Sequence, residues 1–320
     1  MISNKSAEHF VTLFDSKFLP LGMALHNSLM IHAQPFHLWI LCMDALAEEQ
    51  LKQISLPHVT LISLKEIETQ DLLEVKSGRT PVEYCWTLTP FTPQAVFDRD
   101  PHIERITYLD ADIFFFDDPR ILLKELDYSE KHVLITEHAY APEYEQSQAS
   151  GRFCVQFMTF RKTQQATKVM KWWQSRCLEW CFDRVEGGKF GDQKYLDCWP
   201  ELFGDTVHVV QQVEKTLAPW NVLFFEKKIG AKLSPVFYHF QTLRIVGPCK
   251  IRLYLGYKIG KLGLNLYDQY LKSLRKCLTV LNAHHLEVPY VKLKKEKWGI
   301  LRNLKRGITK IVRFASIDYL

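Results

Sequence analysis

Short apolar runs alternate with segments of helical periodicity along most of the chain. Runs of apolar residues predict strands at 9–15, 36–44, 59–67, 106–119, 132–136, 152–161, 207–210 and 236–241. Apolar positions spaced three and four residues apart predict helices at 20–32, 45–54, 163–181 and 192–199. This alternation predicts an α/β protein with a Rossmann-like, mostly parallel central sheet flanked by helices. Ligands of such sheets bind beyond the carboxyl ends of the strands.

Two acids interrupt the apolar stretch ITYLDADIFFFDDP at residues 106–119. If this segment is extended, Asp110 and Asp112 point to the same face. Buried carboxylates need a cation, hydrogen bonds or a proton, and Mg2+ and Mn2+ combine carboxylate oxygens with substrate phosphate. The pair therefore predicts a divalent metal site for a diphosphate, with a solvated strand-to-loop turn as the alternative. Asp117 and Asp118, which follow the phenylalanines, are interpreted as a surface turn.

Composition and segment lengths limit the class of protein. Hydrophobic residues make up 47% of the 320 residues and charged residues 24%, as in globular proteins with a large core. No apolar run approaches the roughly 18 residues of a membrane span, and the polar start lacks the layout of a signal peptide. We therefore expect a cytoplasmic protein whose eight scattered cysteines are reduced. Cys177 and Cys181, at helical spacing, are an alternative metal pair that lacks a second pair of zinc spacing.

Positive charge is concentrated at the C-terminus. Residues 291–320 carry nine Lys and Arg against two acids, and since the chain has a net charge of +5, residues 1–290 are left at −2. Within 291–314, apolar residues at helical spacing predict a basic amphipathic helix on an anionic membrane surface, at the inner face of the membrane. The alternative is a helix packed on the protein's own body. No nucleic acid is expected, because no recognition motif accompanies the tail. We thus expect a main domain at 1–275 and a helical basic extension at 276–320.

Five segments in order resemble the nucleotide-sugar glycosyltransferases of the GT-A fold: VTLFDSKFLPLGMALHNSL, YLDADIFFFDDP, GDQKYLDCWPELF, LAPWN and YHF. The resemblance covers residues 9–245 and is to the family-eight type, which includes glycogenin and lipooligosaccharide galactosyltransferases. It implies a metal-dependent hexosyltransferase that moves a sugar from a nucleotide diphosphate, with UDP favoured, to a glycan or lipid-linked acceptor in cell-surface polysaccharide or lipopolysaccharide synthesis. The chain departs from the family pattern at 154–156, where it has Cys-Val-Gln instead of an Asn-Ala-Gly-like turn. The customary Lys-Pro-Trp is also absent, which leaves Lys250 and Arg252 as candidate phosphate-facing cations.

The resemblance implies a metal site made by Asp110, Asp112 and His239. The metal would be Mn2+ or Mg2+, and an imidazole beside carboxylates shifts the preference towards Mn2+. Without the resemblance, a single histidine in the aromatic strand around His239 is better interpreted as a core residue.

The resemblance also implies residues that bind the donor or the acceptor. They are Phe14 and Asp15 at the base and ribose, Asp192 at the sugar hydroxyls, Gln193 near the reacting anomeric carbon, and Trp220 and Asn221 facing the sugar or the acceptor. Residue chemistry alone leaves alternatives open. Asp192 could cap a helix, Asp15 could belong to a turn, and Trp220 could fill the core.

Two other functions fit part of this pattern. Metal-dependent nucleotidyl or phosphoryl transfer also uses carboxylates on α/β sheets, but a second metal would need a further carboxylate cluster. A non-catalytic module that binds sugar nucleotides fits the departures at 154–156, and it predicts nucleotide binding without turnover.

Overall fold

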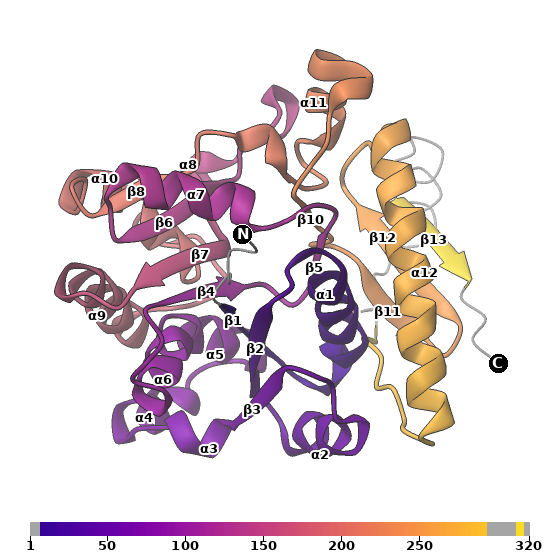
Figure 1. The fold of residues 1–320 in the computed structure, drawn as a ribbon, viewed down its shortest axis with the longest axis horizontal. Coiled ribbons are helices and arrows are strands. Elements are labelled where there is room, and N and C mark those ends of the chain that lie inside the picture. Colours follow the sequence, from indigo (N-terminus) through magenta and orange to yellow (C-terminus); the bar gives the residue numbers. More distant parts are fainter. Residues whose placement is uncertain (1–6, 293–311, 317–320) are drawn as a thin grey trace, which may run out of the picture.

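A seven-stranded sheet forms the centre of the computed structural model, which describes residues 7–292 and 312–316 (Figure 1). The strand order is β3-β2-β1-β4-β7-β6-β8. Only β7 runs against the others, because it pairs antiparallel with both β4 and β6. The strands are β1 (Glu8–Phe14), β2 (Phe36–Cys42), β3 (Val59–Ser63), β4 (Arg105–Leu109), β6 (Val133–Glu137), β7 (Phe153–Arg161) and β8 (Val207–Val209). The mostly parallel sheet predicted from the sequence is therefore confirmed.

Two small sheets and a set of helices complete the fold. One small sheet has the order β5-β10-β9 and the other β11-β12-β13. Their strands are β5 (Ile113–Phe115), β9 (Thr216–Leu217), β10 (Phe237–His239), β11 (Arg244–Gly247), β12 (Lys250–Leu255) and β13 (Val312–Ser316). The α-helices are α1 (Leu19–His32), α2 (Ala45–Ile54), α3 (Leu64–Ile67), α4 (Gln70–Lys76), α5 (Pro81–Leu88), α6 (Thr92–Arg99), α7 (Arg120–Ser129), α8 (Ser147–Ser150), α9 (Gln164–Glu179), α10 (Trp199–Leu202), α11 (Val222–Ile229) and α12 (Lys261–Ala283). The 3-10 helices are η1 (Ser16–Phe18), η2 (Thr89–Phe91), η3 (Pro142–Tyr144), η4 (Gln193–Cys198), η5 (Val213–Lys215) and η6 (Gly230–Lys232).

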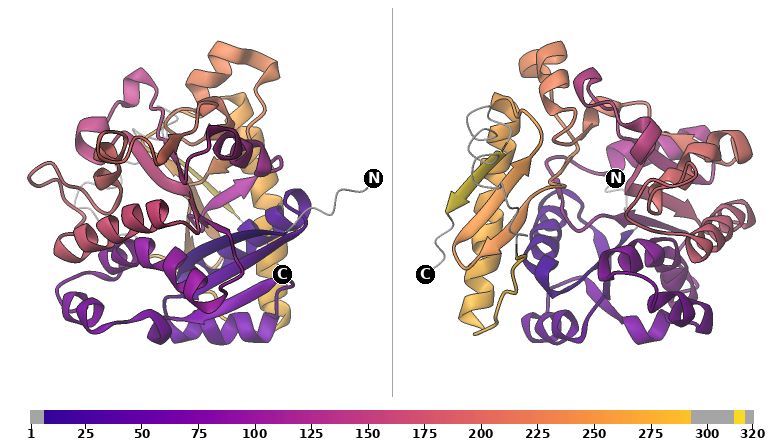
Figure 2. Two further views of the ribbon diagram at one scale, coloured as in Figure 1. Left: turned by 60° about the vertical axis from the view of Figure 1, so that its left-hand side comes forward. Right: turned by 180° about the vertical axis from the view of Figure 1, so that it is seen from behind.

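Hydrophobic cores cover both faces of the central sheet. Along β1, Phe10 and Phe14 pack into one core together with side chains of α1, α7 and α12. Val11 and Leu13 pack into the other core with α6 and α9. Seen from behind, α12 and the β11-β12-β13 sheet form the side of the molecule farthest from α9 (Figure 2). Because both faces are buried, the strands are continuous apolar runs instead of alternating ones.

Acidic residues follow the carboxyl ends of three neighbouring parallel strands, β1, β2 and β4. Asp15 caps η1, and Asp44 caps α2 by accepting a hydrogen bond of 2.7 Å from the backbone of Ala47. Asp110 instead opens a tight turn, in which the N–H of Ile113 donates to the Asp110 carbonyl over 3.2 Å. The turn takes the chain out of the central sheet and into β5. The prediction of one extended stretch through the acid pair was therefore wrong, because β4 ends at residue 109 and β5 begins at 113.

Two further predictions need correction. Residues 64–67, expected in the third strand, form α3 because the Ser63 N–H donates to the Glu66 carboxylate over 2.8 Å and starts a helix. Val312–Ser316, whose first residues were expected at the end of the basic helix, form β13 against β12. The rest of that predicted helix, residues 293–311, lies outside the described residues. The expected boundary after residue 275 falls within α12.

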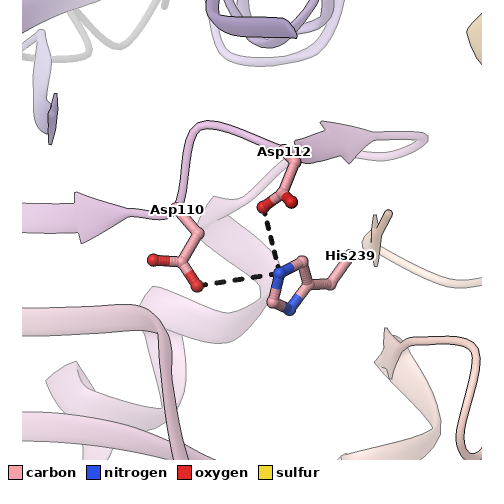
Figure 3. Close-up of side chains that lie close together, drawn as sticks. All are labelled: Asp110, Asp112 and His239. Atoms are coloured by element: carbon pink, nitrogen blue, oxygen red, sulfur yellow. Dashed lines mark hydrogen bonds and ion pairs between the residues drawn. The ribbon is translucent and has the colours of Figure 1, made fainter. Parts of the chain in front are cut away.

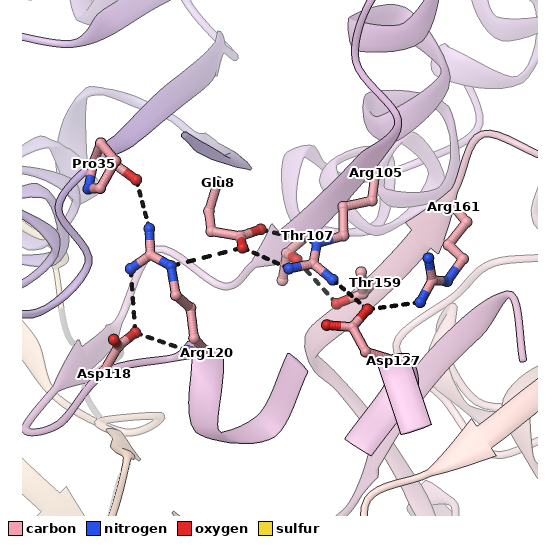
Figure 4. A network of polar contacts seen from close by, with 9 residues as sticks. All are labelled: Glu8, Pro35, Arg105, Thr107, Asp118, Arg120, Asp127, Thr159 and Arg161. Carbon is pink, nitrogen blue, oxygen red and sulfur yellow. Dashed lines mark hydrogen bonds and ion pairs between the residues drawn. The ribbon is translucent and has the colours of Figure 1, made fainter. Parts of the chain in front are cut away.

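An ion-pair network holds the amino-terminal edge of the sheet, opposite the acidic strand ends (Figure 4). Glu8 of β1 accepts hydrogen bonds from Arg105 of β4 over 2.5 and 2.9 Å, and its carboxylate lies 3.7 Å from Arg120 of α7. Asp127 of α7 accepts from Arg105 and from Arg161 of β7 over 2.8 and 2.6 Å. The side chains of Glu8 and Arg120 are each only 10% exposed, and removing one partner of such a buried pair typically costs about 3–5 kcal/mol. The contacts of Asp127, whose side chain is 43% exposed, contribute less. These contacts therefore fix the strands at the edge that carries no candidate site.

Candidate metal and donor site

Asp110, Asp112 and His239 converge where the turn after β4 meets β10 (Figure 3). One ligand atom from each side chain lies within 4.8 Å of the other two. His239 Nε2 is 3.0 Å from Oδ1 of Asp112 and 3.7 Å from Oδ2 of Asp110. The exposed fractions of the side chains are 6% for His239, 8% for Asp112 and 22% for Asp110. Within residues 7–292 and 312–316, no other group of three or more His, Cys, Asp or Glu side chains has such geometry.

Backbone pairing creates this convergence across a long sequence separation. His239 faces Ile113 in the antiparallel β5–β10 ladder, and the N–H of Phe240 donates to the Asp112 carbonyl over 2.8 Å. On the other side, the N–H of Asp110 donates to the carbonyl of Gln156 in β7 over 3.1 Å. The two acids are thus held by two different sheets, one on each side of the turn.

Gln156 and Trp220 orient the histidine. The Nδ1–H of His239 donates to Oε1 of Gln156 over 2.8 Å, because a carbonyl oxygen can only accept. The ring of Trp220 meets the imidazole edge-on, with centroids 5.6 Å apart. Nε2 therefore faces the carboxylates. Sequence reasoning noted residues 154–156 only as a departure from a family pattern, and missed that Gln156 contacts His239.

Burial and mutual charge shift the pKa values of the three groups in different directions. Burial raises the pKa of Asp110 to about 6, although His239 opposes this effect. Burial also acts on Asp112, but the charges and hydrogen bonds of His239 and Arg244 outweigh it and lower the pKa of Asp112. For His239, burial is outweighed by the two carboxylates, which raise the pKa of the imidazole. Asp112 and His239 thus stabilise each other's charged forms, whereas Asp110 takes up a proton more readily than an ordinary aspartate.

The set of metal ligands fits a divalent cation of intermediate hardness. Two carboxylates and one imidazole match Mn2+ well and Mg2+ less well. Ligation through Nε2 requires that this nitrogen carries no proton. The hydrogen bond to Gln156 keeps the ring proton on Nδ1, which leaves Nε2 free to bind a metal, as in most metal-binding histidines.

Arg244, in β11, is a further site residue that the sequence did not reveal. Its Nη1 donates to Oδ2 of Asp112 over 3.3 Å, and its guanidinium lies 4.6 Å from the ring centre of Phe18. Arg252 is its direct partner in the β11–β12 ladder. Burial and the charge of Arg244 lower the pKa of Arg252. The candidate cation Lys250 instead lies over the ring of Phe314. Arg244 beside Asp112, with Arg252 next to it in the ladder, makes this side of the cluster attractive to anions.

Asp192 is buried without full hydrogen bonding. It is 3% exposed, and its Oδ2 has no hydrogen-bond partner among the described residues. It does not cap η4 through its side chain, so helix capping does not explain it. Burial raises the pKa of Asp192 to about 7, an effect that a hydrogen bond with Thr89 reduces and the charge of Asp110 increases. The neighbouring Gln193 donates from Nε2 to the carbonyl of Ser150 over 2.7 Å.

The remaining predicted residues lie in or near the supporting structure. Phe14 is 2% exposed and packs against Gly22, where a side chain would collide with its ring. Asp15 accepts from the backbone of Lys17 and Phe18 in the turn that starts η1. Their roles at the base and ribose remain predictions.

Trp220 and Asn221 support the backbone beside the cluster. Both donate to the carbonyl of His138, over 2.6 and 3.0 Å, and Asn221 also accepts from the N–H of Ala218 over 2.8 Å. Both residues are buried. Their direct contact with the sugar remains a prediction.

Comparison with known proteins places this chain in a family. No family model matches it. Two uncharacterized proteins of Bacillus subtilis (strain 168), YfnD and YfnF, are each 32% identical to it, over 265 and 257 residues. The alignments cover 79% and 76% of this chain and 84% of each relative. This chain belongs to the family of YfnD and YfnF.

Solved structures identify the fold that the YfnD and YfnF family shares with other proteins. The glycosyltransferase GlyE of Streptococcus pneumoniae TIGR4 matches with a TM-score of 0.51 and 16% identity, over 90% of this chain and 66% of that one. The galactosyltransferase LgtC, solved with donor and acceptor sugar analogs, matches with a TM-score of 0.51 and 11% identity, over 91% of this chain and 98% of that one. The GT-A fold predicted from the sequence is therefore confirmed. The narrower resemblance to family eight remains a prediction.

Replacing Gln156 with leucine should weaken Mn2+ binding by about 10–100-fold, because the imidazole loses the partner that fixes its orientation. Calorimetric titration with Mn2+ measures this effect. Gln50→Leu is the matched control, since Gln50 is also buried but donates to the carbonyl of Glu287. Unchanged Mn2+ affinity in folded Gln156→Leu protein would show that Gln156 only fills space.

Replacing Asp192 with asparagine should stabilise the ligand-free protein more at high pH than at low pH. Between about pH 4 and 7 the folded wild type keeps a proton that the unfolded chain releases, so its stability falls as pH rises through this window. The advantage of the variant should grow to at most about 4 kcal/mol and then level off. Urea unfolding at pH 5, 6, 7 and 8 measures it, with Asp98→Asn on the exposed surface of α6 as control. An advantage that is constant with pH would contradict an uncompensated carboxyl at residue 192.

Proposed function

We propose that the protein is a metal-dependent glycosyltransferase that moves a hexose from a nucleoside diphosphate, with UDP favoured, to a glycan or lipid-linked acceptor. The observation that supports this most is the cluster of Asp110, Asp112 and His239 at the carboxyl edge of a GT-A sheet. Buried acids at this position need a cation, and ligands of parallel sheets bind at this edge. The relatives GlyE and LgtC are described as glycosyltransferases, but their low identity carries only the fold to this chain.

We propose that different residues around the cluster bind different parts of the sugar donor. Mn2+ or Mg2+, when bound by Asp110, Asp112 and His239, would neutralise charge on the diphosphate as the sugar leaves. Arg244 lies beside Asp112 and offers a guanidinium, which suits phosphate oxygens. Arg244 and the bound metal would therefore both offer positive charge to the phosphates.

Asp192 and Gln193 are proposed to face the sugar. Oδ2 of Asp192, which has no hydrogen-bond partner among the described residues, would gain a hydrogen bond from a sugar hydroxyl, and its burial makes that bond favourable. Gln193 uses Nε2 to hold Ser150, which leaves its amide oxygen for the reacting end of the donor. Phe14 and Asp15, at the end of β1, are proposed at the base and ribose side.

The two alternative functions are less well supported. Nucleotidyl or phosphoryl transfer with two metals needs a second carboxylate cluster, and the described part of the chain contains none. Asp118, which might have contributed, instead accepts from the backbone and side chain of Arg120 at the start of α7. A binding module without turnover would differ from an enzyme in product formation alone.

Calorimetry should show that UDP binds in the presence of Mn2+ and that Asp112→Asn weakens this binding at least about 100-fold, since the variant loses a ligand and a charge at the metal site. UMP, with one phosphate fewer, should bind more weakly than UDP. Asp98→Asn serves as the control again. If Asp112→Asn still binds UDP in a Mn2+-dependent way with unchanged affinity, the cluster of Asp110, Asp112 and His239 does not belong to the donor site.

Product analysis then separates the three functions. With UDP-glucose or UDP-galactose, Mn2+ and no acceptor, a glycosyltransferase should slowly release UDP and free sugar to water. Release of UMP and sugar phosphate would favour nucleotidyl or phosphoryl transfer. Tight donor binding without any product would favour the binding module.

The basic tail is proposed to bring the enzyme to an anionic membrane surface, where a lipid-linked acceptor would lie. None of the described helices combines the length and the apolar character needed to cross a membrane. The sequence at 293–311, which precedes β13, combines cations with apolar residues at helical spacing, the pattern of helices that lie in the membrane interface. This location is proposed to be peripheral, at the cytoplasmic face.

Reversing three tail charges with Lys305→Glu, Arg306→Glu and Lys310→Glu should weaken binding to vesicles with anionic lipid at least about tenfold, because each cation contributes about 1 kcal/mol. Co-sedimentation with phosphatidylglycerol-containing vesicles measures this. The matched control reverses three exposed lysines of the body: Lys124, Lys168 and Lys171. Equal loss in both triple variants would mean that net charge, and not the tail, directs the binding.

A further inference from the structure

Three tyrosines form a half-buried layer over Trp220, and we call Tyr140, Tyr144 and Tyr257 the tyrosine layer. The rings of Tyr140 and Tyr257 lie 5.9 and 6.4 Å from that of Trp220. Tyr144 packs edge-on against Tyr257, with centroids 5.0 Å apart. His138 stacks on Tyr140 at 4.6 Å and supports the layer from behind.

The tyrosine layer is continuous with the metal cluster. Trp220 contacts the layer on one side and the ring of His239, at 5.6 Å, on the other. A ligand on Tyr257 would therefore lie only two ring contacts away from His239, a distance that one or two sugar units cover. Whatever binds there is placed to meet the reacting end of the proposed donor.

Three chain segments that are far apart in sequence build the layer. Tyr140 and Tyr144 follow β6, Trp220 precedes α11, and Tyr257 lies between β12 and α12. Gly256 has φ +93°, a conformation that side chains rarely adopt, and this turn directs the chain into Tyr257. The convergence therefore depends on the tertiary fold and does not follow from local packing of one element.

The exposure of these tyrosines differs from that of tyrosines in the core. Tyr238, Tyr267 and Tyr270 are at most 1% exposed, whereas all members of the tyrosine layer are only half-buried. Polar groups border the layer: the N–H of Lys258 donates to the Tyr144 hydroxyl over 2.9 Å, and Gln146 is an exposed neighbour. Open aromatic rings beside hydroxyl and amide groups suit a ligand that is apolar on one face and polar at its rim.

We propose that the tyrosine layer binds a pyranose ring of a glycan acceptor; this inference rests on the proposed transfer reaction and names the acceptor side of its site. The C–H face of a pyranose would pack on the tyrosine rings, and its hydroxyls would bond with the tyrosine hydroxyls and Gln146. An alkyl chain would leave those polar groups unpaired, and so it fits less well. The acceptor hydroxyl would thereby be held near the donor held by the metal cluster.

Saturation-transfer NMR tests the inference with defined probes: methyl β-glucopyranoside, methyl β-galactopyranoside, lactose and octyl β-glucopyranoside, each added to protein with UDP and Mn2+. At least one methyl glycoside or lactose should bind, with saturation strongest on the protons of one ring face. Tyr257→Leu and Tyr144→Leu should weaken this binding about five- to tenfold or more, while Tyr257→Phe keeps the ring and most of the affinity. Tyr128→Leu, at an exposed position on α7, is the control. UDP affinity and melting temperature are measured for every variant.

The outcomes separate this inference from the proposed function. Sugar binding that is lost in Tyr257→Leu with UDP affinity intact supports the acceptor site. Sugar binding that is unchanged in both leucine variants overturns it, as does binding of the octyl glycoside alone, which would assign the layer to an alkyl chain. UDP binding without any sugar binding overturns the acceptor site and leaves the donor proposal standing. Failure of UDP itself to bind counts against the proposed function, whatever the sugars do.

Discussion

The structure depends on the placement of two buried carboxyl groups and one partly buried one, with too few cations around them. Asp110, Asp112 and Asp192 share one region, and the charge of Asp110 reaches both of the others. Among the residues that the structure describes, only His239 and Arg244 form ion pairs with Asp110 or Asp112, and none does with Asp192. An arrangement of this kind is unfavourable for an isolated protein. It becomes favourable when a divalent cation and a ligand rich in hydroxyl groups supply the missing partners, and this is the reasoning that connects the fold to a donor site.

The acids at the two ends of the central strands differ in how their negative charge is compensated. At the amino-terminal edge, Glu8 and Asp127 each meet at least two arginine contacts. At the carboxyl edge, the pKa of Asp110 rises to about 6, and Oδ2 of Asp192 has no hydrogen-bond partner in the described part of the chain. The acids Glu8 and Asp127 have arginine partners at the amino-terminal ends of the strands. The shortage of cations and hydrogen bonds is therefore specific to the carboxyl ends. Sites that bind ligands often retain such unsatisfied groups at the expense of stability.

Sequence patterns predicted the parts of this fold that local interactions determine. Apolar runs identified the central strands because both faces of the sheet are buried. The acid pair was recognised, but its geometry was misjudged, since a turn closed by Ile113 brings the carboxylates together and not an extended strand. Gln156 and Arg244 were missed for a different reason. Their contacts depend on how β7 and β11 pair with distant strands, and no local pattern records that register. The helix at 64–67 had a readable capping signal in Ser63 and Glu66, which the strand prediction overlooked.

Trp220 gives the clearest argument that the metal cluster and the tyrosine layer act as one unit. Its ring contacts His239 on one side and Tyr140 and Tyr257 on the other, while its indole N–H is fixed to the carbonyl of His138 over 2.6 Å. A shift of the Trp220 ring would therefore displace both the metal cluster and the tyrosine layer, because densely packed interiors transmit displacement. The orientation of the ligating imidazole and the surface offered to an acceptor are set by the same side chain. Donor and acceptor would then be aligned by packing that exists before either binds, which lowers the entropic cost of bringing them together.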